Sequence, residues 1–210
     1  MTTFGVLVFD GAEELDFIGP WEMLRVWSKY VKGPERCLLV AEAMRPIVCA
    51  KGLSVNPDVA FADCPPLDWL LVPGGEGTRH EVDNIALTGF VARQAAAARA
   101  VLSVCTGSFV LHAAGLLIGR RATTHWGSLD RLRALGDVEV VEERFVRDGE
   151  VWTAAGVSAG IDLMLAFIAA EAGDEVAGKV QFYAEYYPLD RRYGTAADAA
   201  EAPAYLRAKP

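Results

Sequence analysis

The chain has 210 residues, of which 52% are hydrophobic and 23% are charged, and its formal net charge at pH 7 is −8. This length and composition suit one globular domain with a well-buried core. The negative charge argues against nucleic acid or an anionic membrane as a main partner, and no apolar stretch approaches the roughly 18 residues of a membrane span.

The pattern of apolar residues predicts strands and helices in alternation. Residues 4–9 form an apolar run that ends at Asp10 and Gly11, as expected of a buried first strand. Pro20 precedes the apolar-periodic residues 21–27 and suits the first turn of a helix there. Further strands are expected at residues 37–41, 53–55, 69–72, 100–104, 120–124, 138–141, 144–146 and 151–154. Further helices are expected at residues 84–98, 107–114, 158–172 and 174–187.

This alternation indicates one α/β domain, a doubly wound and mostly parallel sheet with helices on both faces. We place the domain at residues 1–188 and expect residues 189–210, rich in alanine and charge, to form an arm or a loosely ordered tail. The N-terminal apolar run has no basic flank, so no secretory signal is expected. The four cysteines show no close pairing, so we expect free thiols in a reducing cytoplasm.

The sharpest local feature lies where the strand at residues 100–104 meets the next helix. Residues 103–107 have the sequence Ser-Val-Cys-Thr-Gly, with a small residue two positions before and two positions after Cys105. This pattern is typical of a nucleophile elbow, whose sharp reversal leaves room only for small neighbours. A thiol at a helix N-terminus favours the thiolate, so we expect a lowered pKa for Cys105. The alternative, a buried structural cysteine, is the interpretation we keep for the other three cysteines.

Two other loops follow strand ends that should meet Cys105 at one edge of a parallel sheet. The loop at residues 11–20 carries three carboxylates, and the loop at residues 73–79 carries three glycines whose backbone can approach a ligand closely. The backbone N–H groups of Gly75 and Thr106 are a candidate pair of oxyanion donors. The glycine loop matches neither a dinucleotide fingerprint nor a phosphate-binding loop.

A cysteine nucleophile commonly works with a histidine base, and the chain has three histidines. His112 lies about two helical turns past Cys105 and should not reach the thiol. His80 lies on the glycine loop and His125 follows a later strand end, which makes His125 the better candidate, although spacing favours neither over a structural role. Three scattered histidines without paired cysteines also argue against a metal site.

Several motifs in this order resemble the DJ-1/PfpI superfamily, and within it the isonitrile hydratases. They lie between about residues 4 and 187, at positions 14–20 (Glu-Leu-Asp-Phe-Ile-Gly-Pro), 63–68 (Asp-Cys-Pro-Pro-Leu-Asp), 73–75 (Pro-Gly-Gly), 103–108 (Ser-Val-Cys-Thr-Gly-Ser), 121–126 (Arg-Ala-Thr-Thr-His-Trp) and 159–162 (Ala-Gly-Ile-Asp). The resemblance implies a flavodoxin-like fold, related to class I glutamine amidotransferases, and a small-molecule substrate with no cofactor. It also implies a homodimer, for which Trp21, Trp27 and Tyr30 are candidate anchors if they do not pack in the core.

The resemblance assigns a role to the residues around the elbow. It places the carboxylate of Asp16 beside Cys105. Thr106 stands where the proteases of the superfamily have histidine, and residues 181–185 (Gln-Phe-Tyr-Ala-Glu) lack the distant histidine of the amidotransferases. Peptidase and amidotransferase chemistry are therefore disfavoured. What the resemblance implies instead is a catalytic set of Cys105, Asp16 and Thr106, with Gly75, Ile18 and Gly19 contacting the substrate.

The implied reaction is hydration of an isonitrile. The Cys105 thiolate would add to the isonitrile carbon while Asp16 acts as general acid, and water would then convert the thioimidate to an N-substituted formamide. We expect a raised pKa for Asp16, from burial and from the neighbouring thiolate.

Two other functions remain open at this point. The same motifs occur in the ligand-sensing domains of AraC-type transcription regulators, here without their DNA-binding module, so a non-catalytic sensor is one alternative. A redox-sensing thiol is the other.

Overall fold

A seven-stranded sheet lies at the centre of the computed structural model, which describes residues 1–188, 193–200 and 202–207. Its strands are β1 (Thr3–Leu7), β2 (Arg36–Ala41), β5 (Val59–Ala60), β6 (Trp69–Val72), β7 (Ala100–Val104), β10 (Phe145–Asp148) and β11 (Val151–Ala154). They follow the order β10-β11-β7-β6-β1-β2-β5, and every neighbouring pair is parallel except β10 with β11. Two small sheets stand apart from it: β3 (Ile47–Val48) with β4 (Ser54–Val55), and β8 (Arg121–Ala122) with β9 (Glu139–Val140).

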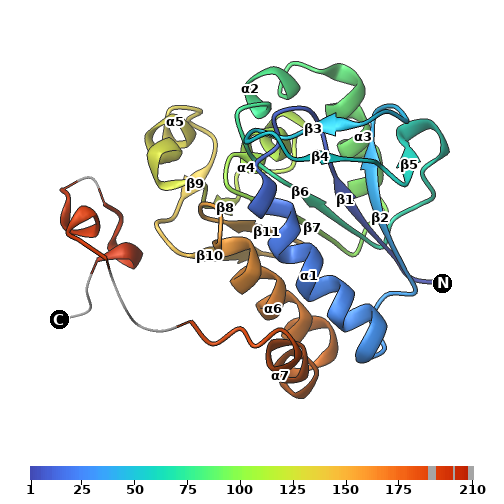
Figure 1. The fold of residues 1–210 in the computed structure, drawn as a ribbon. Helices are drawn as coiled ribbons and strands as arrows, with labels where there is room; N and C mark the ends of the chain where they lie inside the picture. Colours follow the sequence, from blue (N-terminus) through green and yellow to red (C-terminus); the bar gives the residue numbers. More distant parts are fainter. Residues whose placement is uncertain (189–192, 201, 208–210) are drawn as a thin grey trace.

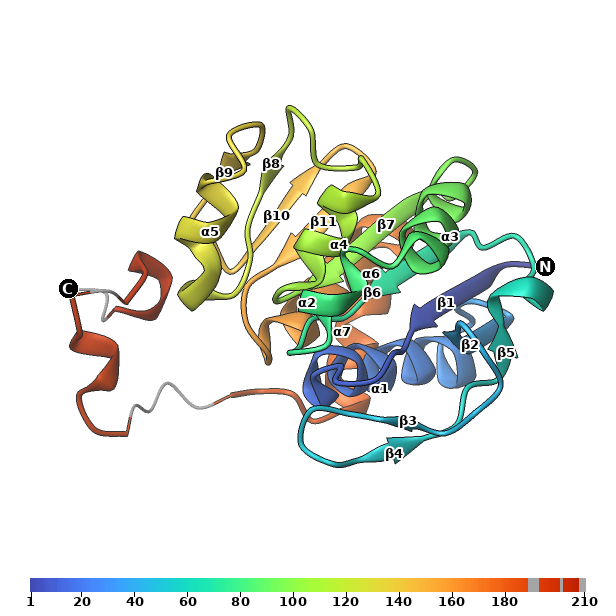
Figure 2. The same cartoon turned by 90° about the horizontal axis from the view of Figure 1, so that it is seen from above.

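Helices cover both faces of this sheet (Figures 1 and 2). The helices are α1 (Glu14–Tyr30), α2 (Thr78–Glu81), α3 (Ile85–Ala95), α4 (Gly107–Ala113), α5 (Leu129–Arg133), α6 (Ala159–Ala172) and α7 (Asp174–Tyr183). In the view from above, α1, α6 and α7 lie on one side of the sheet, and α3 and α4 lie on the other. The expected single-domain, doubly wound α/β fold is confirmed.

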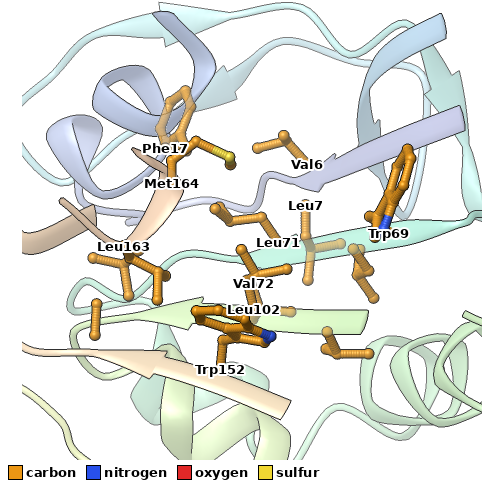
Figure 3. Close-up of a cluster of buried hydrophobic side chains, with 14 of the residues drawn as sticks. Val6, Leu7, Phe17, Trp69, Leu71, Val72, Leu102, Trp152, Leu163 and Met164 are labelled. Carbon is orange, nitrogen blue, oxygen red and sulfur yellow. The ribbon is translucent and has the colours of Figure 1, made fainter. Parts of the chain in front are cut away.

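The central strands are apolar because both faces of a parallel sheet are covered. Every residue of β1, β6, β7 and β11 is buried. Figure 3 shows Leu71 and Leu102 of the sheet together with Leu163 and Met164 of α6 in one hydrophobic cluster, and all four are fully buried. Full burial of one such side chain is worth about 1.5–3 kcal/mol, so this layer is the main source of stability.

The predicted start of the first helix is wrong. α1 begins at Glu14 and runs through Pro20, which therefore lies in its second turn. Proline has no N–H to donate to the Asp16 carbonyl one turn earlier, which is why the sequence pattern favoured a later start. Tertiary packing offsets that loss: a Cβ on Gly160 of α6 would lie 2.9 Å from the Pro20 ring, so the two helices are in close contact there.

Two smaller expectations also change. The strands expected at residues 53–55, 120–124 and 138–141 exist as short strands, but they lie outside the central sheet. The last helix ends at Tyr183, earlier than expected. No helix among the described residues is long and apolar enough to cross a membrane.

The C-terminal arm is described in part. Residues 189–192, 201 and 208–210 of this predicted arm lie outside the described residues. The remainder passes beside α5 (Figures 1 and 2) and contains the short 3-10 helices Ala196–Asp198 and Ala204–Leu206. Ala202 and Pro203 are buried, so this part of the arm packs on the domain.

Candidate functional site

Three loops that follow strand carboxyl ends meet at one edge of the sheet. They are the loops after β1, β6 and β7, which lead into α1, α2 and α4. β1 continues to β2 on one side, while β6 and β7 lie on its other side. The order of the strands therefore proceeds from β1 first to one side and then to the other. Ligands bind at such a switch point in open α/β sheets. Asp16, Gly75 and Cys105 come from these three loops.

Cys105 has a left-handed backbone, with φ of 56°. A non-glycine residue in this conformation costs roughly 1–3 kcal/mol and persists only where its surroundings fix it. Its N–H lies 3.1 Å from the carbonyl oxygens of both Ala154 and Ala155, and its carbonyl accepts from the Thr124 hydroxyl at 2.9 Å and from the Ser108 hydroxyl at 3.3 Å. Hydrogen bonds on both sides of the residue thus hold the strained turn.

Two glycines around this turn have no room for a side chain. A Cβ on Gly107 would lie 2.3 Å from the Val72 carbonyl oxygen. A Cβ on Gly74 would lie 2.5 Å from the Thr106 nitrogen and 2.8 Å from Oδ2 of Asp16. The backbones of the β6 and β7 loops therefore touch, and this contact positions Asp16 against the elbow.

Asp16 is completely buried in the first turn of α1. Its Oδ2 accepts from the Gly74 N–H at 2.9 Å, while Oδ1 has no hydrogen-bond partner among the described residues. The carboxyl lies close enough to the Cys105 thiol for each group to affect the pKa of the other. Burial raises the pKa of Asp16 to about 8, against the lowering effect of the Gly74 N–H and with a further raising contribution from Glu13. The expected rise is present, with burial as its main cause, and at neutral pH this carboxyl is protonated.

The expected lowering of the thiol pKa is wrong. Burial raises the pKa of Cys105 to about 12, and the charge of Asp16 adds to the rise. The Thr106 N–H and hydroxyl lower this pKa, but by less. The sulfur is held at the end of a helix of only seven residues and is 7% exposed, so desolvation outweighs the helix terminus.

The candidate oxyanion pair is not available as expected. The Gly75 N–H donates to the Thr106 hydroxyl at 3.0 Å, and Thr78 Oγ1 lies 3.0 Å from the same oxygen. The Thr106 N–H lies near enough to the Cys105 sulfur to lower the pKa of the thiol. Gly75 therefore fixes the Thr106 side chain, and Thr106 in turn faces the thiol.

Cys105 lies at the floor of a pocket of about 200 Å³. The pocket is lined by Gly75, Glu76, Thr78, Arg79, Cys105, Thr106, His125, Ser128, Arg131 and Val157. Two predicted substrate contacts, Ile18 and Gly19, are not in this lining: Ile18 is 38% exposed, and Gly19 faces Ile161 of α6. Their role stays a prediction, whereas Gly75 does line the pocket.

Of the three histidines, His125 is the one brought to the pocket. Its Nδ1 accepts from the Gly127 N–H at 3.2 Å, and burial lowers its pKa, so the ring is neutral with its proton on Nε2. His112 pairs with Asp137 at 2.8 Å, and the exposed His80 lies beside Glu81. Among the described residues no three His, Cys, Asp or Glu side chains are grouped as metal ligands, and all four cysteines are free thiols.

Sequence reasoning missed several residues that shape the site. Thr124 holds the Cys105 carbonyl, and Thr78 bonds to Thr106. Thr124 belongs to the block at residues 121–126 that was noted only as a motif, and no local signal marked Thr78. Arg79 and Arg131 reach the pocket from α2 and α5, which no sequence spacing connects to Cys105.

Comparisons with known proteins show what the chain is similar to. A family model described as the DJ-1/PfpI family matches residues 4–170. The chain is 41% identical over 184 residues to an isonitrile hydratase from Pseudomonas putida, covering 88% of this chain and 78% of the relative. It is 33% identical to the HTH-type transcriptional regulator CdhR from Pseudomonas aeruginosa, covering 84% of this chain but 53% of the regulator.

The fold has a close counterpart among solved structures. A ThiJ/PfpI family protein from Pseudomonas syringae superposes with a TM-score of 0.85 at 33% identity, covering 98% of this chain and 83% of that chain.

Proposed function

This chain belongs to the DJ-1/PfpI family, and we propose that it hydrates an isonitrile to the N-substituted formamide, with Cys105 as the nucleophile and Asp16 as the proton carrier. The observation that carries the proposal is the buried Asp16–Cys105 pair, in which a carboxyl group that is protonated at neutral pH lies beside the thiol. The similarity to an isonitrile hydratase supports the substrate class.

The first step adds the thiol across the isonitrile carbon. The Cys105 sulfur forms a bond to that carbon, Asp16 gives its proton to the same carbon, and the carboxyl recovers the thiol proton. The product is a thioimidate, R–N=CH–S–Cys105, and the carboxyl is left as it started. Because Asp16 exchanges one proton for another, neither a free thiolate nor a charged carboxylate has to persist in the buried pocket.

The two oxygens of Asp16 suit this exchange. Oδ2 accepts from the Gly74 N–H, so the carboxyl proton belongs on Oδ1, which has no partner among the described residues. Asp16 is fully buried and does not itself line the pocket, so this proton would reach the substrate carbon once that carbon is at the neighbouring Cys105 sulfur.

The second step returns the enzyme to its resting state. Water adds to the thioimidate carbon, and Asp16 passes one proton of this water to the imine nitrogen. The tetrahedral adduct R–NH–CH(OH)–S–Cys105 then expels the sulfur, which takes the proton of the hydroxyl group. The formamide R–NH–CHO leaves. Thr106 faces the sulfur throughout and positions it through its hydroxyl, which the Gly75 N–H holds in place.

The test is turnover of cyclohexyl and phenyl isonitrile, followed by NMR detection of the formamide. We expect Cys105→Ala to lower kcat/KM by at least about a thousandfold, because the variant lacks the sulfur that forms the proposed covalent intermediate. Cys64→Ala is the matched control, since that half-buried thiol lies outside the pocket, and it should keep its activity. Absence of turnover by the native chain would refute the proposed function, and turnover by Cys105→Ala would refute the role of the thiol.

A ligand-sensing function is the second candidate, because the chain is also similar to a transcriptional regulator. In that case isonitriles or other small molecules would bind in the pocket and raise the melting temperature without being converted. A redox sensor is less well supported, since a thiol whose pKa is raised to about 12 is slow to oxidise.

Homodimerisation and a cytoplasmic location remain predictions. Of the three candidate anchors, Trp27 packs in the core and Trp21 packs partly against it, whereas Tyr30 is 55% exposed and stacks on Tyr183. We propose that this tyrosine pair belongs to a dimer contact. Sedimentation equilibrium of the native chain and of Tyr30→Ala would test it.

A further inference from the structure

Two arginines at the pocket mouth have no part in the proposed proton and sulfur chemistry. Arg79 of α2 and Arg131 of α5 line the same pocket as Cys105, and both are exposed at its rim. Neither has a carboxylate within 4.0 Å among the described residues. Arg120 and Arg133, by contrast, are each paired with acidic side chains.

Arg131 is held in place by an aromatic ring. Its guanidinium carbon lies 4.2 Å from the centroid of the Phe109 ring, and Phe109 is buried in α4 next to the elbow. Stacking uses the face of the guanidinium and leaves the N–H donors at its edge free for a planar anion. A stacked arginine also loses less side-chain freedom when it binds, so it is organised in advance for a ligand.

The rest of the pocket does not neutralise these two charges. Asp16 is protonated at neutral pH, the thiol of Cys105 keeps its proton, and His125 is neutral. Glu76 is the remaining acidic residue in the lining. Glu13, the other nearby carboxylate that acts on Asp16, is paired with Lys51. In a chain of net charge −8, the pocket is thus a local cationic site.

We infer that the substrate is an anionic isonitrile, in which a carboxylate close to the isocyano group is bound by Arg131 and Arg79 while the isonitrile carbon faces Cys105. This inference rests on the proposed function and specifies its substrate class. A pocket of about 200 Å³ suits a small molecule of this type, such as an α-isocyano carboxylate. A carboxylate also matches the fork of donors that a stacked guanidinium presents.

The first experiment compares potassium isocyanoacetate with ethyl isocyanoacetate, which differ in the negative charge. We expect kcat/KM for the carboxylate to exceed that for the ester by about tenfold or more, as for a charge-assisted hydrogen bond. The ratio of the two values should fall by about tenfold in Arg131→Gln and further in the Arg79→Gln/Arg131→Gln double variant. The loss should appear as a higher KM for the carboxylate, because the arginines would bind it equally well in the ground state and in the transition state.

The matched control is Arg93→Gln, which removes the same charge from an exposed site on α3 outside the pocket and should leave the ratio unchanged. An ester that is hydrated as well as the carboxylate by the native chain would overturn the inference. So would a carboxylate preference that survives in the double variant.

A second experiment separates this inference from the proposed function. Iodoacetate and iodoacetamide alkylate a thiol at the same carbon but differ in charge, and peptide mass spectrometry follows Cys105 alone. We expect the ratio of the iodoacetate rate to the iodoacetamide rate to fall several-fold in the double variant relative to the native chain and Arg93→Gln. If isonitriles are not turned over but this ratio falls, the proposed function fails and anion recognition stands. An unchanged ratio overturns anion recognition.

Discussion

Leu102 and Cys105 lie three residues apart on the same strand and its turn, in very different surroundings. Leu102 is fully buried among apolar side chains of the sheet and its covering helices (Figure 3). Cys105 is also buried, but it has a left-handed backbone and lies near a carboxyl group, one oxygen of which has no hydrogen-bond partner among the described residues. Backbone strain and buried polar groups lower the stability of the fold. Apolar packing in the middle of the sheet must therefore offset this loss of stability at the C-terminal ends of the strands. Stability and chemistry therefore depend on different residues of one strand.

The largest expected effect is on activity, at the end of the sheet where Asp16 and Cys105 lie. Asp16→Asn keeps an oxygen for the Gly74 N–H but removes the acidic proton, so we expect kcat/KM to fall by about 10²–10⁴-fold. The fold should remain at least as stable at pH 7.5, because a buried ionisable group is removed. Glu22→Gln, an exposed change on the same helix, should have no effect on either. An Asp16→Asn variant with more than a tenth of the native activity would contradict the role of this carboxyl.

The opposite result is expected in the middle of the sheet. Leu102→Ala leaves a cavity in the core and should lower the free energy of unfolding by about 2–5 kcal/mol. Below its melting transition the variant should keep kcat within about twofold of the native value, since the elbow is held by its own hydrogen bonds. Urea unfolding and turnover at one temperature measure both. Leu53→Ala, on an exposed loop, is the control for stability. A tenfold loss of kcat in Leu102→Ala would show that the middle of the sheet and the elbow are coupled.

The stability of the fold should depend on pH through Asp16. Its pKa in the folded chain, about 8, is higher than the ordinary value of 3.8, so between these pH values the native state holds a proton that the unfolded state has lost. Stability should therefore fall as pH rises from about 4 to about 8, by up to roughly 1.4 kcal/mol per pH unit from this group. The test is to measure the urea midpoints of the native chain and of Asp16→Asn at pH 5 and at pH 7.5. The change with pH in the difference between the two proteins is the contribution of Asp16.

Activity should follow the same group. Because the proposed mechanism needs the protonated carboxyl, kcat/KM should decline as pH rises above about 8. A flat difference in stability between pH 5 and 7.5, or activity that rises steadily through pH 9, would be incompatible with a protonated Asp16.

The smallest effect is expected at Thr124. Thr124→Val removes the hydroxyl that donates to the Cys105 carbonyl, which should lower stability by about 1–2 kcal/mol and kcat by less than about tenfold. Thr88→Val removes a similar hydroxyl-to-carbonyl bond in α3, far from the pocket. Both variants should lose some stability, but only Thr124→Val should change kcat. Equal kcat values in the two would mean that the strained turn does not depend on this bond.

Local patterns in the sequence predicted much of the fold. The four buried central strands are mostly apolar, and the elbow at Cys105 is marked by its small neighbours, because a sharp turn tolerates little else. The resemblance also paired Asp16 with Cys105, and in the structure the buried carboxyl lies near the thiol, while their catalytic roles stay a proposal. These features depend on residues close in the chain or on motifs that occur together.

The tertiary structure decided what depends on distant partners. Packing against α6 lets α1 run through Pro20, although proline within a helix favours a break. The Thr106 hydroxyl, and not a ligand, takes the Gly75 N–H. Burial sets the proton on Asp16 and keeps the thiol of Cys105 protonated, against the effect of the helix terminus. The sequence determined which side chains carry the chemistry, but their protonation follows from desolvation, and desolvation depends on the whole of what folds around them.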